Sequence, residues 1–143
     1  MALYLDSAYM AKCYLQEPDS RSVRALVEGE TELFSTAWAV VEMACIFHRH
    51  LREGRLKKHE ALALQERFEA HVEEGLWVLA PLSEGLLRRA AEALKKLEAR
   101  VLLRAGDTIH LVTAQAAGFH EVWSSDRNLL RAAPHFGVRG RSV

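Results

Sequence analysis

The feature that most constrains the fold is the alternation of short apolar runs with longer stretches of near-helical apolar spacing. Four of these runs have the length and composition of buried strands, and they lie at Leu3–Leu5, Leu33–Ser35, Leu76–Leu79 and Val122–Ser124. A fifth, short terminal strand is expected at Val138. Short apolar strands separated by helices are typical of βαβ units, in which parallel strands form a sheet covered by helices. The sequence therefore predicts an α/β fold with a mostly parallel central sheet flanked by helices.

Capping residues and glycines indicate where the helices between these strands should begin and end. A Ser, Thr or Asp precedes most of the periodic apolar stretches, and a glycine follows several of them. The predicted helices lie, in order, near residues 10–14, 20–28, 36–51, 57–73, 84–97, 108–117 and 127–133. Asp107 and Asp126 are the predicted N-caps of the last two helices.

Length and composition limit the classes of protein that this chain can represent. Its 143 residues predict one domain, residues 1–143. Nineteen basic and nineteen acidic residues give a net charge of zero, so any polyanion must be held locally rather than by a strong overall field. The longest apolar runs have five residues, whereas a membrane-spanning helix needs ~20. The start of the chain lacks the pattern of a secretory signal, and we expect a cytoplasmic protein.

Three carboxylates fall where the predicted fold gathers strand ends and helix starts. Asp6 follows the first strand, Asp107 opens a helix, and Asp126 follows the strand Val122–Ser124. Ligands of open parallel sheets bind outside the carboxyl ends of the strands. N-capping would explain each of these residues singly, because Asp is among the best N-caps. Their convergence on one edge of the sheet favours a functional site.

Glu42 is a fourth acid, and it lies in the otherwise uncharged segment Ala37–Phe47, about two turns into the predicted helix. A buried charge must be paired, bound to metal or neutralised, so we expect Glu42 to need a cation. Four acids at one sheet edge would repel one another unless divalent cations lie between them. Ligation by oxygen alone indicates Mg²⁺ or Mn²⁺.

Four segments resemble, in order and in spacing, the acidic motifs of the PIN-domain family, and in particular of its VapC-type toxin ribonucleases. These segments are Tyr4–Ser7, Ala39–Glu42, Leu103–Leu111 and Trp123–Leu130. The resemblance covers nearly the whole chain. One departure is Ala8, which stands where the family often has a second hydroxyl residue after the first acid.

This resemblance implies a three-layer PIN-like α/β fold and a Mg²⁺- or Mn²⁺-dependent endoribonuclease that hydrolyses single-stranded or structured RNA. It also implies that the protein is the toxin of a toxin–antitoxin pair, held in check by a cognate antitoxin protein. Family members are usually homodimers, and the helices at Val23–Val27 and Leu62–Val72 are candidate interface surfaces. Under this interpretation the catalytic residues and metal ligands are the four acids Asp6, Glu42, Asp107 and Asp126.

Several polar residues near the motifs are candidates for supporting roles. Ser7 and Ser124 could hydrogen-bond the carboxylates, with plain helix capping as an equally supported alternative. Arg127 and Arg131 belong to an acid-free segment that runs to the end of the chain, and they are candidates for binding RNA phosphates. Solvated surface is the alternative for these arginines. His110 lies one turn beyond Asp107, and a packing or hydrogen-bonding role is favoured over direct ligation of metal.

The remaining histidines, cysteines and tryptophans are expected to be structural. His48 and His50 point to different faces of a predicted helix, so they are interpreted as solvent-facing side chains rather than a shared zinc site. Cys13 and Cys45 lie in apolar helical stretches and are interpreted as small buried thiols. Trp38 and Trp77 are expected in the core.

Two other classes of protein were considered. A degenerate, non-catalytic PIN-like module that binds RNA or protein is the main alternative, and the presence of all four acids argues against it. A phosphoacceptor receiver domain would share the sheet, but it needs paired acids after the first strand. Here Ser7 and Ala8 follow Asp6.

Overall fold

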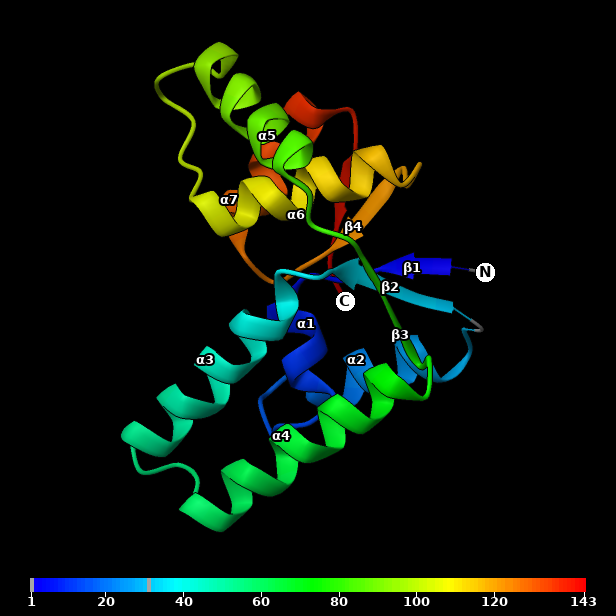
Figure 1. Ribbon diagram of the computed structural model, residues 1–143, viewed down its shortest axis with the longest axis vertical. Helices are drawn as coiled ribbons and strands as arrows, with labels where there is room; N and C mark the ends of the chain where they lie inside the picture. Colours follow the sequence, from blue (N-terminus) through cyan, green and yellow to red (C-terminus); the bar gives the residue numbers. More distant parts are fainter. Residues whose placement is uncertain (1, 31) are drawn as a thin grey trace.

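The computed structural model describes residues 2–30 and 32–143, in which short strands alternate with helices (Figure 1). The strands are β1 (Ala2–Tyr4), β2 (Glu32–Thr36), β3 (Trp77–Ala80), β4 (Glu121–Trp123) and β5 (Arg139–Arg141). The helices are α1 (Ser7–Lys12), α2 (Ser20–Glu28), α3 (Ala39–Arg52), α4 (Lys58–Glu73), α5 (Glu84–Lys96), α6 (Ala105–Ala116), α7 (Arg127–Ala132) and the 3₁₀ helix η1 (Ala133–Phe136). This alternation confirms the predicted α/β fold.

All the strand pairs are parallel. β1 pairs with β2 and β2 with β3, while β4 pairs with β5. A parallel bridge between Leu5 and Trp123 joins the two groups, and the Asp6 amide donates to the Trp123 carbonyl at 3.1 Å. The strand order is therefore β3-β2-β1-β4-β5. The chain adds strands outward in one direction from β1 and then in the other from β4, so the order reverses between β1 and β4. Such a reversal opens a crevice at the carboxyl ends of the two strands.

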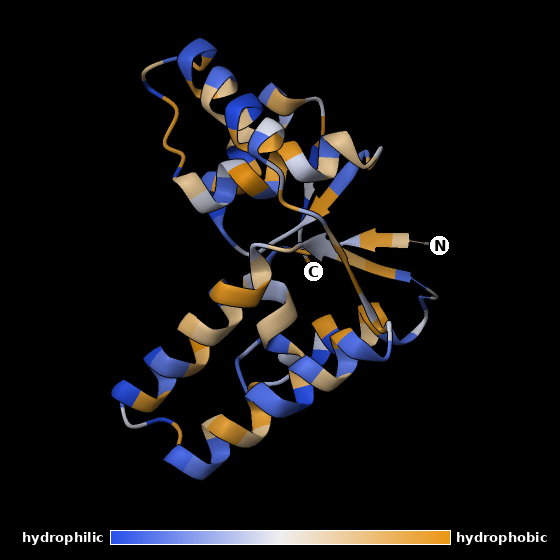
Figure 2. Cartoon of the chain, in the orientation of Figure 1, coloured by the Kyte–Doolittle hydropathy of each residue, from blue (hydrophilic) through white to orange (hydrophobic). Residues whose placement is uncertain are grey.

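Helices cover both faces of the sheet, with α1–α4 on one face and α5–α7 on the other (Figure 1). Successive residues of β1 point to opposite faces. Leu3 and Leu5 join the core under α1–α4, whereas Tyr4 joins the core under α5–α7. Figure 2 shows that β1, which lies inside the sheet, is largely hydrophobic, as a strand covered on both faces should be.

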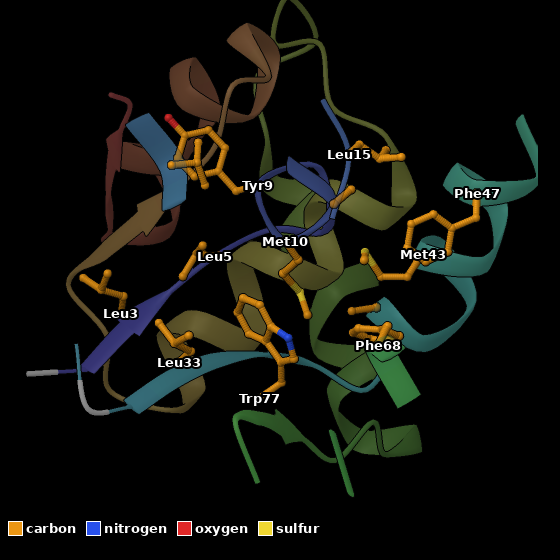
Figure 3. Packing of buried hydrophobic residues seen from close by; sticks show 13 residues of the cluster. Leu3, Leu5, Tyr9, Met10, Leu15, Leu33, Met43, Phe47, Phe68 and Trp77 are labelled. Carbon is orange, nitrogen blue, oxygen red and sulfur yellow. The ribbon is translucent and has the colours of Figure 1, made fainter. Parts of the chain in front are cut away.

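The core under α1–α4 is built around large side chains from the sheet and the helices (Figure 3). Met10 of α1 is fully buried, and Met43 of α3 packs in the same cluster with Phe68 of α4. Trp77 begins β3 in this core, where its indole Nε1 donates to the Tyr14 hydroxyl at 2.7 Å. The core prediction for Trp77 is confirmed. These contacts fix α3, and with it Glu42, against the sheet.

One charged side chain is buried beside this core. Lys12, at the end of α1, has a side chain only 9% exposed. Its ammonium lies 2.9 Å from Glu17 Oε2 and 2.7 Å from Asp19 Oδ1. Burial lowers the pKa of Lys12, but the hydrogen bonds to these two carboxylates outweigh burial and raise the pKa above its ordinary value. The ion pairs fasten α1 to the turn that precedes α2.

Several sequence expectations about single side chains are wrong. His50 is buried rather than solvent-facing, because the turn between α3 and α4 folds back and donates two backbone N–H groups to its carbonyl. His48 is exposed, as expected. Val23 is fully buried, so the Val23–Val27 surface is largely part of the core. In the second candidate interface, Leu62 is 55% exposed.

The helices have a further property that bears on the class of protein. Within residues 2–30 and 32–143, no helix has both the length and the apolar composition required to cross a membrane.

Candidate active site

Two of the four acids lie at the carboxyl ends of the strands where the sheet order reverses. Asp6 directly follows Leu5 and is the N-cap of α1, with its Oδ1 accepting from the Tyr9 amide at 2.9 Å. Asp126 is the N-cap of α7, and its Oδ1 accepts from the amides of Asn128 and Leu129 at 2.8 and 3.2 Å. Each carboxylate is thus held by the first turn of a helix.

The other two acids come from helices that begin at the same edge of the sheet. Glu42 lies in the first turn of α3, not two turns in, because the helix starts at Ala39 rather than directly after β2. Asp107 is the third residue of α6 and not its N-cap, because the helix starts two residues earlier and Arg104 occupies the N-cap position. The structure brings all four acids to the wall of one cavity of about 650 Å³.

Ser124 connects two of these acids. Its hydroxyl donates to Asp6 Oδ2 at 2.5 Å and accepts from the Asp126 amide at 2.9 Å. Burial raises the pKa of Asp6 above its ordinary value, and the charge of His110 and the hydrogen bonds from Ser124 and Tyr9 offset only part of that effect. Both Asp6 oxygens therefore have a donor, and the carboxylate has a fixed orientation.

Glu42 is held through one of its two oxygens. Ser7 Oγ donates to Oε1 at 2.8 Å, and His110 Nε2 lies 2.6 Å from the same oxygen. Burial alone would raise the pKa of Glu42, but hydrogen bonds from His110, Ser7 and Trp38 and the electrostatic effect of His110 keep it below its ordinary value. Part of the pairing expected for this acid is therefore supplied by Ser7 and His110.

Asp107 has a different environment. Among the residues that the structure describes, none donates a hydrogen bond to its carboxylate. Burial raises the pKa of Asp107 to about 6, and the negative charges of Asp126, Asp6 and Glu42 contribute to the increase. Asp107 is therefore the acid that repulsion among the four carboxylates affects most.

The donor set fits a hard divalent cation by its chemistry. Across residues 2–30 and 32–143, no three Asp, Glu, His or Cys side chains are already grouped closely enough to hold a metal ion. Asp126 Oδ2 and the carboxylate of Asp107 nevertheless lack donors in the described part of the chain, and Glu42 Oε2 lies at the cavity wall. All are oxygens of the type that Mg²⁺ and Mn²⁺ prefer. A cation would also relieve the repulsion that raises the pKa of Asp107.

Two cations that were not among the predicted site residues line the same cavity. Arg49 and Arg104 both contribute to its wall, and neither forms an ion pair with a described residue. Arg49 follows Glu42 by two helical turns, so the helical period places both residues on one face of α3. That spacing could have identified Arg49 from the sequence.

The two arginines that were selected lie elsewhere. Arg127 is exposed beside Asp126 but does not line the acidic cavity. Arg131 lines a separate cavity of about 290 Å³ together with Arg100 and Asn128. Residues of the segment that precedes α6 line both cavities, as do residues at the start of α7.

Two further side chains were placed wrongly. Cys45 is exposed and lines the acidic cavity, whereas Cys13 is half-buried. Trp38 is half-buried and forms a wall of the cavity instead of lying in the core. Gly106 closes the same wall, because a Cβ atom there would lie 2.9 Å from Glu42 Oε2 and 3.2 Å from Trp38 Nε1. The structure therefore needs glycine at this position for close approach.

With this geometry established, comparison with known proteins identifies the family. The PIN domain matches residues 3–134, which is most of the chain. This chain belongs to the PIN domain family. Comparison with curated protein sequences gives no match.

Solved structures share the fold of this PIN domain. Mycobacterium tuberculosis VapC20, described as a toxin that cleaves the sarcin–ricin loop, has a TM-score of 0.73 at 15% identity, over 96% of this chain and 98% of that chain. FitAcB from Neisseria gonorrhoeae has a TM-score of 0.71 at 18% identity, over 98% and 96%. VapBC2 from Rickettsia felis, bound to a promoter DNA fragment, has a TM-score of 0.66 at 13% identity, over 100% and 99%. At these identities the likeness shows the fold.

Proposed function

We propose that this PIN domain is a Mg²⁺- or Mn²⁺-dependent endoribonuclease and the toxin of a toxin–antitoxin pair. The observation that carries the proposal is the convergence of four carboxylates, from four separate segments, on one cavity at the point where the sheet order reverses. Membership of the family supports a nuclease. The VapC20 toxin, whose fold is similar, is described as cleaving the sarcin–ricin loop.

The four acids have distinct parts in this proposal. Asp107 and Asp126 would offer free oxygens to the ion, and Glu42 would do so through Oε2, while Asp6 is oriented by Ser124. A divalent ion held by such carboxylates supplies an activated water and neutralises charge that develops on the phosphate. Ser7 and Ser124 keep the carboxylates in place, because each hydroxyl donates to an acid oxygen.

RNA would enter along the cations of the cavity. Arg49 and Arg104 lie on the same wall as the acids and lack ion-pair partners among the described residues. Guanidinium groups bind phosphates through paired N–H donors, so these arginines are suited to the phosphates next to the scissile bond. Arg127 and Arg131 would contact the RNA farther from the scissile bond, because both lie outside the acidic cavity.

The proposal also includes protein partners and a place in the cell. FitAcB and VapBC2 are named as complexes, and the latter is bound to promoter DNA, which supports a cognate antitoxin for this chain. We expect the antitoxin to place an arginine among the four acids, because a guanidinium can bond carboxylates bidentately and does not deprotonate. A homodimer and a cytoplasmic location complete the proposal.

The direct test is cleavage of end-labelled single-stranded RNA by the purified chain. Cleavage with Mn²⁺ or Mg²⁺, its loss in EDTA and its recovery when the metal is restored are expected. RNA binding that persists with no cleavage under any metal condition would instead support the non-catalytic alternative. Matched protein carrying Glu66→Gln, an exposed acid on α4, should behave as wild type.

A further inference from the structure

The two oxygens of Glu42 lie in different environments. Oε1 accepts from Ser7 Oγ at 2.8 Å and contacts His110 Nε2 at 2.6 Å. Oε2 lies at the cavity wall formed by Gly106 and Trp38. Oε1 is therefore held by two protein side chains, whereas Oε2 lies at the cavity.

His110, which contacts Oε1 of Glu42, is itself held by a second residue. Tyr4 Oη lies 3.1 Å from His110 Nδ1, and the two rings meet edge to face with centroids 5.9 Å apart. Both side chains are 1% exposed. The Tyr4 hydroxyl is therefore within hydrogen-bonding distance of Nδ1 and holds the ring on the side away from Glu42. A carboxylate only accepts, so the proton between His110 and Glu42 comes from Nε2.

This chain of contacts joins the two sides of the fold. Tyr4 belongs to β1 and to the core under α5–α7, His110 to α6, and Glu42 to α3 on the opposite face of the sheet. A buried histidine needs a polar partner at its ring nitrogens, and here the partner at Nε2 is one of the four acids of the cavity. In many metal sites, hydrogen bonds from residues outside the ligand shell orient the side chains that bind the ion. Tyr4 and His110 have the same relation to Glu42.

We propose that Tyr4 and His110 are positioning residues that hold Glu42 by Oε1 and so aim Oε2 at the ion-binding cavity. This inference rests on the proposed function, because it assigns the orientation of one of the proposed ligands. Outer hydrogen-bond partners of metal ligands typically contribute about 10- to 100-fold to metal affinity or activity. The same range is expected for Tyr4 and His110.

The test measures Mn²⁺ affinity of the purified full chain by isothermal titration calorimetry, with RNA cleavage measured separately. Tyr4→Phe keeps the ring and removes the hydroxyl, and His110→Leu removes both ring nitrogens. His110→Gln retains an N–H donor near the position of Nε2 and should recover most of the affinity. We expect Tyr4→Phe and His110→Leu to weaken Mn²⁺ binding by about tenfold or more.

The fold provides a matched control at another tyrosine–histidine pair. The Tyr14 hydroxyl lies 2.7 Å from His71 Nδ1, outside the acidic cavity. Tyr14→Phe therefore removes the same group from the same kind of pair without reaching Glu42. Its Mn²⁺ affinity should equal that of the wild type even though its thermal stability falls.

The outcomes separate this inference from the proposed function. Wild-type Mn²⁺ affinity in folded Tyr4→Phe, or a loss of affinity in His110→Gln as large as in His110→Leu, would overturn the positioning role while RNA cleavage by the wild type stood. A wild-type chain that neither binds Mn²⁺ nor cleaves RNA would overturn the proposed function itself. If His110→Leu does not fold, Tyr4→Phe and His110→Gln still decide the question.

Discussion

The Ser124 hydroxyl donates to Asp6 Oδ2 across 2.5 Å and so ties the end of β4 to the end of β1. The two residues are 118 positions apart in the sequence and belong to strand groups that are joined, in the part of the chain that the structure describes, by one bridge between Leu5 and Trp123. Ser124 also accepts from the Asp126 amide, so one side chain sets the spacing of two acids. This relationship leads to the first prediction.

Ser124→Ala should leave a fully buried carboxylate without one of its donors. A lost hydrogen bond to a buried charged group costs about 1–3 kcal/mol, and RNA cleavage should fall by about 10- to 100-fold. Chemical denaturation and cleavage rates measure the two effects. Ser125→Ala changes the exposed neighbour and should alter neither quantity; equal losses in both variants would argue against a specific role for Ser124.

Gly106→Ala should reduce activity without a large loss of stability. The new Cβ would lie 2.9 Å from Glu42 Oε2 and 3.2 Å from Trp38 Nε1, so the carboxylate must shift. Alanine is favoured over glycine in helices by about 1 kcal/mol, which offsets part of the strain. Gly85 holds the same second position in α5, and a Cβ there meets only Ser83 Oγ at 3.8 Å. Gly85→Ala should therefore leave cleavage unchanged, and equal activity in both variants would contradict the prediction.

Asp107→Asn should stabilise the metal-free protein near neutral pH. The folded-state pKa of about 6 lies above the ordinary value of 3.8, so the carboxylate destabilises the fold above pH 6, and this effect fades as the pH falls toward 3.8. After discounting for partial solvent exposure and the favourable helix dipole, the gain is about 1 kcal/mol. Thermal melts in EDTA at pH 7.5 and pH 4 measure it. A gain that does not shrink at the lower pH would show that the buried negative charge of Asp107 is not its cause.

Lys12→Met should destabilise the fold by about 1–2 kcal/mol, because it removes the shared partner of two carboxylates that are only partly exposed. The raised pKa of Lys12 means that its contribution is fully present below pH 10.5 and is lost as the pH rises further. Lys95 pairs with Glu92 at 2.6 Å, but its side chain is 70% exposed. Lys95→Met should cost less than about 0.5 kcal/mol. Equal decreases in the free energy of unfolding of the two variants, measured by urea denaturation, would contradict this prediction.

Local sequence patterns predicted the order of the strands and helices and the position of two of the four acids. Asp6 and Asp126 could be placed because each combines a strand end with an N-cap, which are both local signals. The start of α6 was misplaced because Ala105 and Gly106 carry no capping signal, and Asp107, a good N-cap, follows them. Local rules favour the wrong boundary there.

The remaining features depend on contacts between distant segments. His110 is 68 residues from Glu42 and 106 from Tyr4, so no periodicity links these three side chains. Cys45 has the neighbours of a core residue in the sequence, yet the face of α3 that carries it borders the cavity. Such positions follow from which helix packs on which face, and that information lies in the tertiary structure.

The most direct test of the central claim is RNA cleavage by Asp126→Asn. Asparagine keeps an oxygen that can accept from the Asn128 and Leu129 amides, so the helix cap and the fold should survive. It removes the anionic oxygen proposed to face the ion. We predict a folded variant with weakened Mn²⁺ binding and no measurable cleavage, whereas Glu66→Gln retains both. Cleavage at the wild-type rate by folded Asp126→Asn would contradict a metal-dependent site built on these four acids.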